Sequence, residues 1–209
     1  MKINEIFYSI QGEGKWSGKP NIFIRTTGCN LRCSYCDTKY AYIDGKDYSI
    51  DQILETIKKY PCEDICITGG EPLLQEEMIN LINELTKRNY KIIIETNGSK
   101  KINDLIKNKK LTISMDIKTP SSGMEKEMIF ENIILLREKD QIKFIIKDKK
   151  DYDYAKKTIN TYKIKSNIYL QPEWNTDPSI LAEWILKDGL SVKLGLQIHK
   201  ILWNNKRGK

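Results

Sequence analysis

Three cysteines in one short segment constrain this chain more than any other feature. Cys29, Cys33 and Cys36 follow a CxxxCxxC spacing within residues 28–38, so one irregular loop can wrap all three around a single inorganic cluster. A structural zinc site needs four protein ligands, and an electron-transfer iron–sulfur centre is normally held by four thiolates. Three thiolates would leave one iron of a four-iron cluster open, and an open metal position is where a substrate or cosubstrate binds. The loop is therefore expected to do chemistry.

The same thiols could instead form a zinc knuckle completed by Cys62, Cys66 or His199. Cys62 and Cys66 lie at the approach to an apolar segment, where a free cysteine usually behaves as a small hydrophobic residue. The cluster loop is the favoured interpretation. The alternatives outside enzymes are an iron–sulfur electron carrier and a basic zinc module that binds nucleic acid.

Length and composition place the chain in a broad class. With 209 residues it can bury one substantial core, and a single domain over residues 1–209 is expected. The first residues carry no apolar leader, no apolar run is long enough for a membrane, and five cysteines make an odd number, so we expect a reduced, cytoplasmic protein. The net charge is +7, but lysine is scattered along the chain, so a solvated basic surface is favoured over nucleic-acid or membrane binding.

Apolar strands alternate with amphipathic helices along the chain. The strands are expected at Ile3–Ile10, Asn21–Thr26, Asp64–Thr68, Ile92–Thr96, Leu111–Ile117, Ile142–Ile146, Ile168–Leu170 and Val192–Leu196. The helices are expected at Ile50–Ile57, Met78–Leu85, Ile129–Leu136, Tyr152–Tyr162 and Ile180–Leu186. About six strand–helix pairs predict an α/β fold, an incomplete TIM-like (β/α)6 barrel with parallel strands.

Polar residues gather where these strands end. Arg25 precedes the cysteine loop, Thr68 precedes Gly69-Gly70-Glu71-Pro72, and the next two strands end in Glu95-Thr96-Asn97-Gly98 and Asp116-Ile117-Lys118. Because active groups of such sheets collect at the carboxyl ends of the strands, we expect all four segments on one rim. Arg25 is a candidate carboxylate clamp. The turn Gln11-Gly12-Glu13-Gly14 offers donors and acceptors to a heterocycle edge.

The cysteine loop, with aromatic Tyr35 before its third cysteine, resembles that of the radical S-adenosylmethionine (SAM) superfamily, and Gly69-Gly70-Glu71-Pro72 resembles that superfamily's GGEP segment. The resemblance implies a [4Fe–4S] cluster on Cys29, Cys33 and Cys36, with SAM on the open iron. It also implies SAM contacts from the following residues: Tyr35, Cys36, Asp37, Gly69, Gly70, Glu71, Thr96, Asn97, Asp116, Ile117 and Lys118.

A closer resemblance covers nearly the whole chain. The QGEG turn, the segments around the cysteines, Thr68–Pro72, Glu95–Gly98, Pro120-Ser121-Ser122-Gly123 and Gln197-Ile198-His199-Lys200 together resemble the 7-carboxy-7-deazaguanine synthase family. This implies a carbon–nitrogen lyase that converts 6-carboxy-5,6,7,8-tetrahydropterin to 7-carboxy-7-deazaguanine with loss of ammonia, towards the queuosine and archaeosine bases of tRNA. The implied substrate contacts are Ile10, Gln11, Gly12, Glu13, Arg25, Thr68 and His199.

The same resemblance implies Mg²⁺ with Thr38 as a protein ligand, an electron donor such as flavodoxin or ferredoxin, and a homodimer. In some members of the family the chain ends soon after the His-Lys pair, and its terminal carboxylate reaches the substrate. Here residues 201–209 continue past that pair, so this contact is not carried over to the present chain. The rival enzyme is a glycyl-radical activase, which also uses CxxxCxxC in a short barrel. An activase would need an open mouth for a protein loop and would have no use for Gln11, Glu13 and His199.

Overall fold

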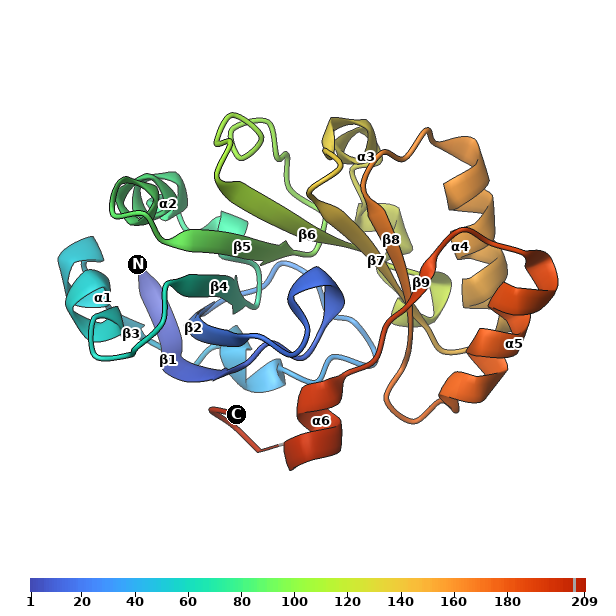
Figure 1. The fold of residues 1–209 in the computed structure, drawn as a ribbon, viewed down its shortest axis with the longest axis horizontal. Coiled ribbons are helices and arrows are strands. Elements are labelled where there is room, and N and C mark those ends of the chain that lie inside the picture. Colours follow the sequence, from blue (N-terminus) through green and yellow to red (C-terminus); the bar gives the residue numbers. More distant parts are fainter. Residues whose placement is uncertain (205) are drawn as a thin grey trace.

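A curved sheet, built largely of parallel strands, forms the centre of the computed structural model, which describes residues 1–204 and 206–209 (Figure 1). The strands lie in the order β3-β1-β2-β4-β5-β6-β7-β8-β9, and the order does not return to its start, so the barrel stays open. The strands are β1 (Lys2–Ile10), β2 (Pro20–Thr26), β3 (Lys46–Asp47), β4 (Asp64–Gly69), β5 (Lys91–Thr96), β6 (Leu111–Ile117), β7 (Gln141–Ile146), β8 (Asn167–Pro172) and β9 (Lys193–Leu194).

Helices α1–α5 surround the outside of this sheet, and α6 lies at its open side near the C-terminus (Figure 1). At the start of α1, Ser49 and Gln52 form the reciprocal capping box expected from the sequence. None of the helices in the described part of the chain combines the length and apolar character needed to cross a bilayer. The helices are α1 (Ile50–Ile57), α2 (Met78–Lys87), α3 (Glu131–Leu135), α4 (Lys149–Thr161), α5 (Pro178–Asp188) and α6 (Ile198–Trp203).

The predicted incomplete TIM-like architecture is confirmed, and individual elements differ from the expectation. Strand β1 was expected to be parallel, but it pairs antiparallel with β2, because the short connection through residues 11–19 can only reverse the chain. The last strand is two residues long instead of five, and α4 begins at Lys149, where Asp148 caps its first turn. Described residues 97–110, between β5 and β6, form turns and no α-helix.

Side chains alternate between the two faces of the parallel strands. Ile22 and Ile24 of β2 point to the helices, as do Ile65 and Ile67 of β4 and Ile92 and Ile94 of β5, and all six are fully buried in the main core. The residues between them face the barrel interior, where Phe23, Cys66 and Ile93 form a small apolar layer with Phe7 and Trp16. Because the period of a strand is two residues, the next inward positions are Arg25, Thr68 and Glu95. The polar rim therefore stands on an apolar floor.

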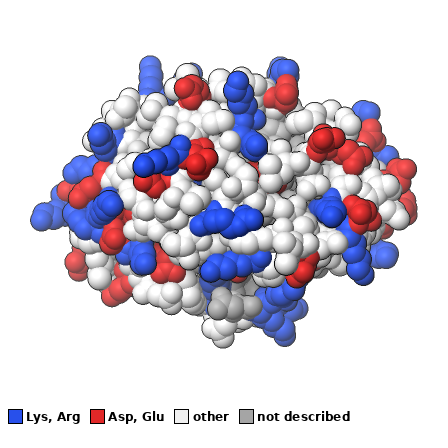
Figure 2. Space-filling model, turned by 180° about the vertical axis from the view of Figure 1, so that it is seen from behind, with Lys and Arg blue, Asp and Glu red and all other residues white. Residues whose placement is uncertain are grey.

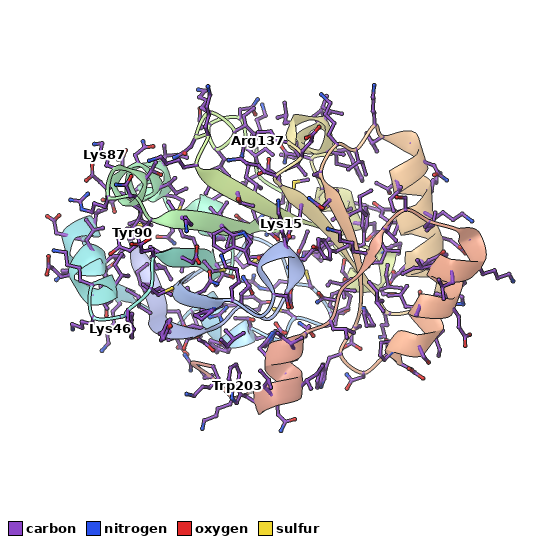
Figure 3. The ribbon with its side chains drawn as sticks, in the orientation of Figure 1. Lys15, Lys46, Lys87, Tyr90, Arg137 and Trp203 are labelled. Atoms are coloured by element: carbon purple, nitrogen blue, oxygen red, sulfur yellow. The ribbon has the colours of Figure 1, made fainter. Side chains whose placement is uncertain are left out.

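Asp140 and Arg137 hold the part of the barrel that lacks a helix. Asp140 is fully buried and accepts hydrogen bonds from the backbone N–H groups of Ile113 (2.9 Å) and Arg137 (2.8 Å). The Arg137 guanidinium donates to the same carboxylate and to the carbonyl oxygens of Ile106, Asn108 and Leu111. Arg137, labelled in Figure 3, thus ties the β5–β6 connection to the segment before β7.

We expect Arg137→Met to lower the free energy of unfolding by about 3 kcal/mol, because it leaves the Asp140 carboxylate buried without its cation. Urea unfolding of the metal-free protein, followed by circular dichroism, measures this. The matched control is Arg88→Met, which removes an exposed i,i+4 pair with Glu84 and should cost about 0.5 kcal/mol or less. Equal losses in both variants would contradict the structural role of Arg137.

Candidate functional site

A cavity of about 610 Å³ opens at the carboxyl ends of the parallel strands. It is lined by the cysteine loop, the QGEG turn, the ends of β4 to β8 and the first residues of α6, which come from the whole length of the chain. All the site residues predicted from the sequence line this cavity except Glu71 and Ile117. Those on its wall are Ile10, Gln11, Gly12, Glu13, Arg25, Cys29, Cys33, Tyr35, Cys36, Asp37, Thr38, Thr68, Gly69, Gly70, Thr96, Asn97, Asp116, Lys118 and His199.

Hydrogen bonds fix the cysteine loop at its first residue and in its middle. Gly28, with a φ of +95° that favours glycine, donates its N–H to Ala41 O and accepts from Glu71 N, both at 2.8 Å. In the middle of the loop, Ser34 donates its N–H to Ser122 O (3.1 Å) and its hydroxyl to Ser121 O (2.6 Å). The loop therefore keeps its shape through contacts with Ala41, with the segment after β4 and with the segment after β6.

The three thiols are unpaired and half-buried at the edge of the cavity. The Cys29 sulfur accepts from Leu31 N (3.4 Å) and from the Asn97 side chain (3.7 Å), and such bonds to sulfur are typical of cluster-binding loops. Burial raises the pKa of the Cys33 thiol; Lys118 opposes this shift, and nearby Cys36 and Cys29 add to it. The donor set, three soft thiolates around one hollow, fits a [4Fe–4S] cluster with one iron left open.

Cys62 and Cys66 do not belong to this loop. Cys62 precedes β4, so it lies at the amino end of the strands, opposite to the rim that carries the cysteine loop. Its sulfur lies near the Pro20 and Asp64 carbonyl oxygens. Cys66 is buried in the apolar floor, and its sulfur accepts from Gln11 Nε2 at 3.3 Å. A zinc site that uses Cys62 with the loop thiols is therefore not supported by the fold.

Two glycines line the cavity beside the cysteine loop because no side chain fits there. A Cβ on Gly70 would lie 2.1 Å from Gly28 O, and a Cβ on Gly69, whose φ is +149°, would lie 2.4 Å from Thr26 O. Both neighbours are backbone atoms, which cannot move aside. The wall therefore exposes bare backbone to a ligand, as the sequence predicted for Gly69 and Gly70.

Glu71 and Ile117, two of the residues that the resemblance places at SAM, do not line the cavity. Glu71 is fully buried behind the cavity wall, where its carboxylate accepts from Leu73 N (2.9 Å), Asn97 N (2.7 Å) and the Thr96 hydroxyl (2.9 Å). These bonds hold the ends of β4 and β5 together, so Glu71 shapes the wall without reaching the cavity. Ile117 is an apolar strand residue that points into the core.

Asp116 and Lys118 form an ion pair at the end of β6, with Nζ 2.8 Å from Oδ2. Burial opposes ionisation of Asp116, but Lys118 and Lys143 outweigh it and lower the pKa of Asp116 to about 2. Tyr35 lies nearby, and burial raises the pKa of its hydroxyl to about 12. This side of the cavity therefore holds a permanently ionised carboxylate and a neutral phenol.

The C-terminal helix α6 closes the cavity over the QGEG turn. His199 packs so tightly on Gly12 that a Cβ there would lie 1.8 Å from His199 Nδ1, and Ile198 N donates to Gly12 O at 3.0 Å. Burial lowers the pKa of His199, against the opposing effect of Glu13, so its imidazole is neutral at neutral pH. Lys200 reaches Asp37 of the cysteine loop (2.5 Å), and the Thr38 hydroxyl donates to Asp37 as well (2.8 Å).

Arg25 is held so that its terminal nitrogens stay available. Its Nε donates to Glu5 Oε1 (2.8 Å), and its guanidinium lies between the Phe7 and Tyr40 rings, 5.7 Å from each centroid. Tyr40 donates to the same Glu5 oxygen. The Arg207 guanidinium also lies over the Tyr40 ring, 4.0 Å from its centroid. A guanidinium oriented in this way can bind a carboxylate with two parallel bonds.

The fold also brings to this cavity Lys143 and Gln171, two polar residues that the sequence analysis did not single out. Lys143 and Gln171 lie within apolar strands, and a charged or amide side chain at such a position is the signal that could have found them. Gln171 is 1% exposed, and neither atom of its amide has a hydrogen-bond partner in the described structure. A buried amide without a partner fits a wall that a polar ligand completes.

The comparisons with known proteins agree with this arrangement. The profile of the radical SAM superfamily matches residues 23–178. A 7-carboxy-7-deazaguanine synthase from Thermoplasma acidophilum is 36% identical over 208 residues, 100% of both chains. Another from Methanospirillum hungatei is 41% identical over 206 residues, covering 97% of this chain and 85% of its relative.

Among solved structures, the crystal structure of QueE from Escherichia coli is similar with a TM-score of 0.79 at 24% identity, over 94% of this chain and 93% of that chain. At this identity the likeness supports the fold alone. The superfamily profile and the full-length relatives go further. This chain belongs to the radical SAM superfamily and, within it, to the 7-carboxy-7-deazaguanine synthase family.

Proposed function

We propose that this protein converts 6-carboxy-5,6,7,8-tetrahydropterin to 7-carboxy-7-deazaguanine and ammonia. The observation that carries the proposal is that the three-thiol loop, the QGEG turn, Arg25 and His199 open onto the same cavity. Relatives aligned over the full length bear the name of this synthase. A glycyl-radical activase gains no support, because α6 packs over the QGEG turn where a protein loop would enter.

Membership of the superfamily implies a [4Fe–4S] cluster and SAM, and the residues present fit both. Cys29, Cys33 and Cys36 would hold three irons, and the bare backbone at Gly69 and Gly70 would take the amino group of SAM. When bound, the reduced cluster and SAM supply a 5′-deoxyadenosyl radical that abstracts hydrogen from the substrate. The protein binds and orients the substrate and shields the reacting atoms from water.

On the substrate side, Gln11 and Glu13 would read the pterin edge, and Arg25 would hold its carboxylate. Burial raises the pKa of Glu13, but Lys143 and the hydrogen bond from Gln197 outweigh it and lower the pKa, so Glu13 is ionised at neutral pH. An ionised carboxylate accepts from the adjacent N–H groups of a pterin ring. The apolar floor of Phe7 and Phe23, stacked with centroids 4.8 Å apart, would exclude water beneath the reacting carbon.

We further propose that Mg²⁺ binds beside the substrate carboxylate, with Thr38 as a protein ligand. The Thr38 hydroxyl lies on the cavity wall next to the Asp37 carboxylate, and oxygen donors of this kind suit Mg²⁺. Ions of this type keep several waters and bind partly through substrate oxygens, so a site with few protein ligands is sufficient.

Partners and cellular role stay predictions: flavodoxin or ferredoxin as electron donor, a homodimer, a cytoplasmic location, and a product that feeds the deazapurine bases of tRNA. Direct binding of nucleic acid or membrane is not part of the proposal. On the face shown in Figure 2, Lys and Arg side chains are interspersed with Asp and Glu, which is typical of a solvated surface.

The central test is anaerobic reconstitution with iron and sulfide, followed by reductant, SAM, Mg²⁺ and the tetrahydropterin. We expect 7-carboxy-7-deazaguanine by mass spectrometry from the wild-type protein and none from Cys33→Ala, which lacks one cluster ligand. Cys62→Ala is the matched control, because Cys62 lies at the far end of the strands, and it should keep activity. Cleavage of SAM without formation of 7-carboxy-7-deazaguanine would show that the tetrahydropterin is not the substrate.

Arg25→Ala should raise the KM for the tetrahydropterin about tenfold to a hundredfold, since a hydrogen bond to a charged group contributes about 1.5–3 kcal/mol and each 1.4 kcal/mol is tenfold. The absorbance and magnetic spectra of the cluster should stay unchanged. Arg25→Lys keeps the charge but not the two-nitrogen fork, and it should recover only part of the loss. Loss of the cluster spectrum in Arg25→Ala would show that Arg25 is structural instead.

Removal of Mg²⁺ by a chelator should raise the KM for the tetrahydropterin, and added Mg²⁺ should reverse the effect. Thr38→Ala should need a higher Mg²⁺ concentration for half-maximal rate, while Thr176→Ala, a half-buried threonine that does not line the cavity, should match the wild type. The measurement is steady-state product formation against Mg²⁺ concentration. Identical Mg²⁺ curves for Thr38→Ala and the wild type would exclude Thr38 as a ligand.

A further inference from the structure

Lys143 is a buried lysine in the middle of the parallel sheet. Its position on β7 lies in register with Asp116 of β6 and Tyr169 of β8, and its side chain points into the barrel interior with 4% of the residue exposed. A lysine almost never occupies such a place unless its charge is paired. The surrounding residues must therefore supply negative charge.

Three carboxylates from three different elements meet this ammonium group. Its Nζ lies 2.7 Å from Glu13 Oε2, 2.9 Å from Glu95 Oε2 and 3.4 Å from Asp116 Oδ1. Glu13 comes from the QGEG turn after β1, and the other two come from the ends of β5 and β6. Three carboxylates so close together would repel one another in a buried cavity without a cation between them.

Glu13 is held from both sides. Lys143 donates to one oxygen, and Gln197, directly before α6, donates its Nε2 to the other oxygen at 2.6 Å. Each carboxylate oxygen can accept a second bond, so Glu13 keeps free lone pairs while its plane is fixed. The only groups that decide the direction of this carboxylate, within the described structure, are thus Lys143 and Gln197.

We propose that Lys143 is a positioning residue of the reaction, which holds the Glu13 carboxylate as an oriented acceptor for the heterocycle edge of the substrate. The inference rests on the proposed function and adds a residue to it. Lys143 acts through Glu13, and its ion pairs with Glu95 and Asp116 join the substrate side of the cavity to the side that faces SAM.

The charges around Glu13 give the proposal a pH signature. The groups that face it are Lys143 of β7, Glu95 of β5, Asp116 of β6 and His199 of α6. Burial raises the pKa of Glu13, and Lys143 outweighs this, so the pKa lies below its usual value and Glu13 is ionised at neutral pH. Without Lys143, burial and the two other carboxylates would all raise it. Glu13 would then lose its proton only at higher pH.

We therefore expect Lys143→Met to raise the KM for the tetrahydropterin about tenfold and to move the acid limb of kcat/KM up by about one pH unit. Lys143→Arg keeps the cation and should stay within about threefold of the wild type, with the acid limb unmoved. Lys143→Gln is a second neutral variant that keeps a polar side chain in the buried position. All are assayed as the reconstituted holoenzyme, with cluster content and thermal unfolding measured for each.

A double-mutant cycle shows whether Lys143 acts through Glu13. Glu13→Gln should raise the KM as Lys143→Met does, and the combination of Lys143→Met with Glu13→Gln should be no worse than Glu13→Gln alone. The control is Lys107→Met, which removes an exposed lysine that pairs with Asp104 outside the cavity and should leave both KM and the pH profile as in the wild type.

Additive effects of the two substitutions, or neutral Lys143 variants with the wild-type KM and acid limb, would overturn the inference. So would an Arg variant as impaired as the Met variant with the same pH profile, because that is the result of a purely structural role. If the wild type releases 5′-deoxyadenosine but no 7-carboxy-7-deazaguanine, the proposed function fails, and this inference with it. If the wild type forms 7-carboxy-7-deazaguanine and Lys143→Met has the same KM and pH profile, the inference about Lys143 fails while the proposed function stands.

Discussion

The site depends on the two-residue alternation of side chains across parallel strands. One face of β2, β4 and β5 is filled with isoleucine packed under helices, which leaves the other face to Phe23, Cys66 and Ile93 and, one step further, to Arg25 and Thr68. A shift of one residue in any strand would bury the polar rim in the core and turn isoleucine to the cavity. The apolar packing outside the barrel therefore positions the chemistry inside it.

Closure of the cavity comes from the last segment of the chain. Helix α6 reaches the QGEG turn through Gln197 and His199 and the cysteine loop through Lys200. These contacts join residues more than 160 positions apart, and they involve the two regions that would touch substrate and cluster. An isolated barrel without α6 would leave Glu13 and Asp37 without these partners. The chain end is thus part of the site and not an appendage.

Buried charge is balanced locally at each part of the cavity. Asp116 pairs with Lys118 beside the cysteine loop, Arg25 pairs with Glu5 at the first strand, and Lys143 stands among three carboxylates. Charged groups held in fixed positions by such pairs present an oriented electrostatic field to a bound ligand. Outside the site, the Arg137 and Asp140 pair uses the same principle to replace a missing helix.

The sequence by itself determined the features that are local in the chain. The cysteine spacing lies within eight residues, the glycines of residues 69–70 follow directly on an apolar strand, and strand–helix alternation defines the open barrel with parallel strands. Only the tertiary structure decided that β1 runs antiparallel and that Glu71 lies behind the wall. It alone brought Lys143 to Glu13 and left the Gln171 amide without a hydrogen-bond partner among the described residues. The reason is physical: burial and pairing depend on strand register and on contacts between distant segments, and neither has a signature within a short stretch of sequence.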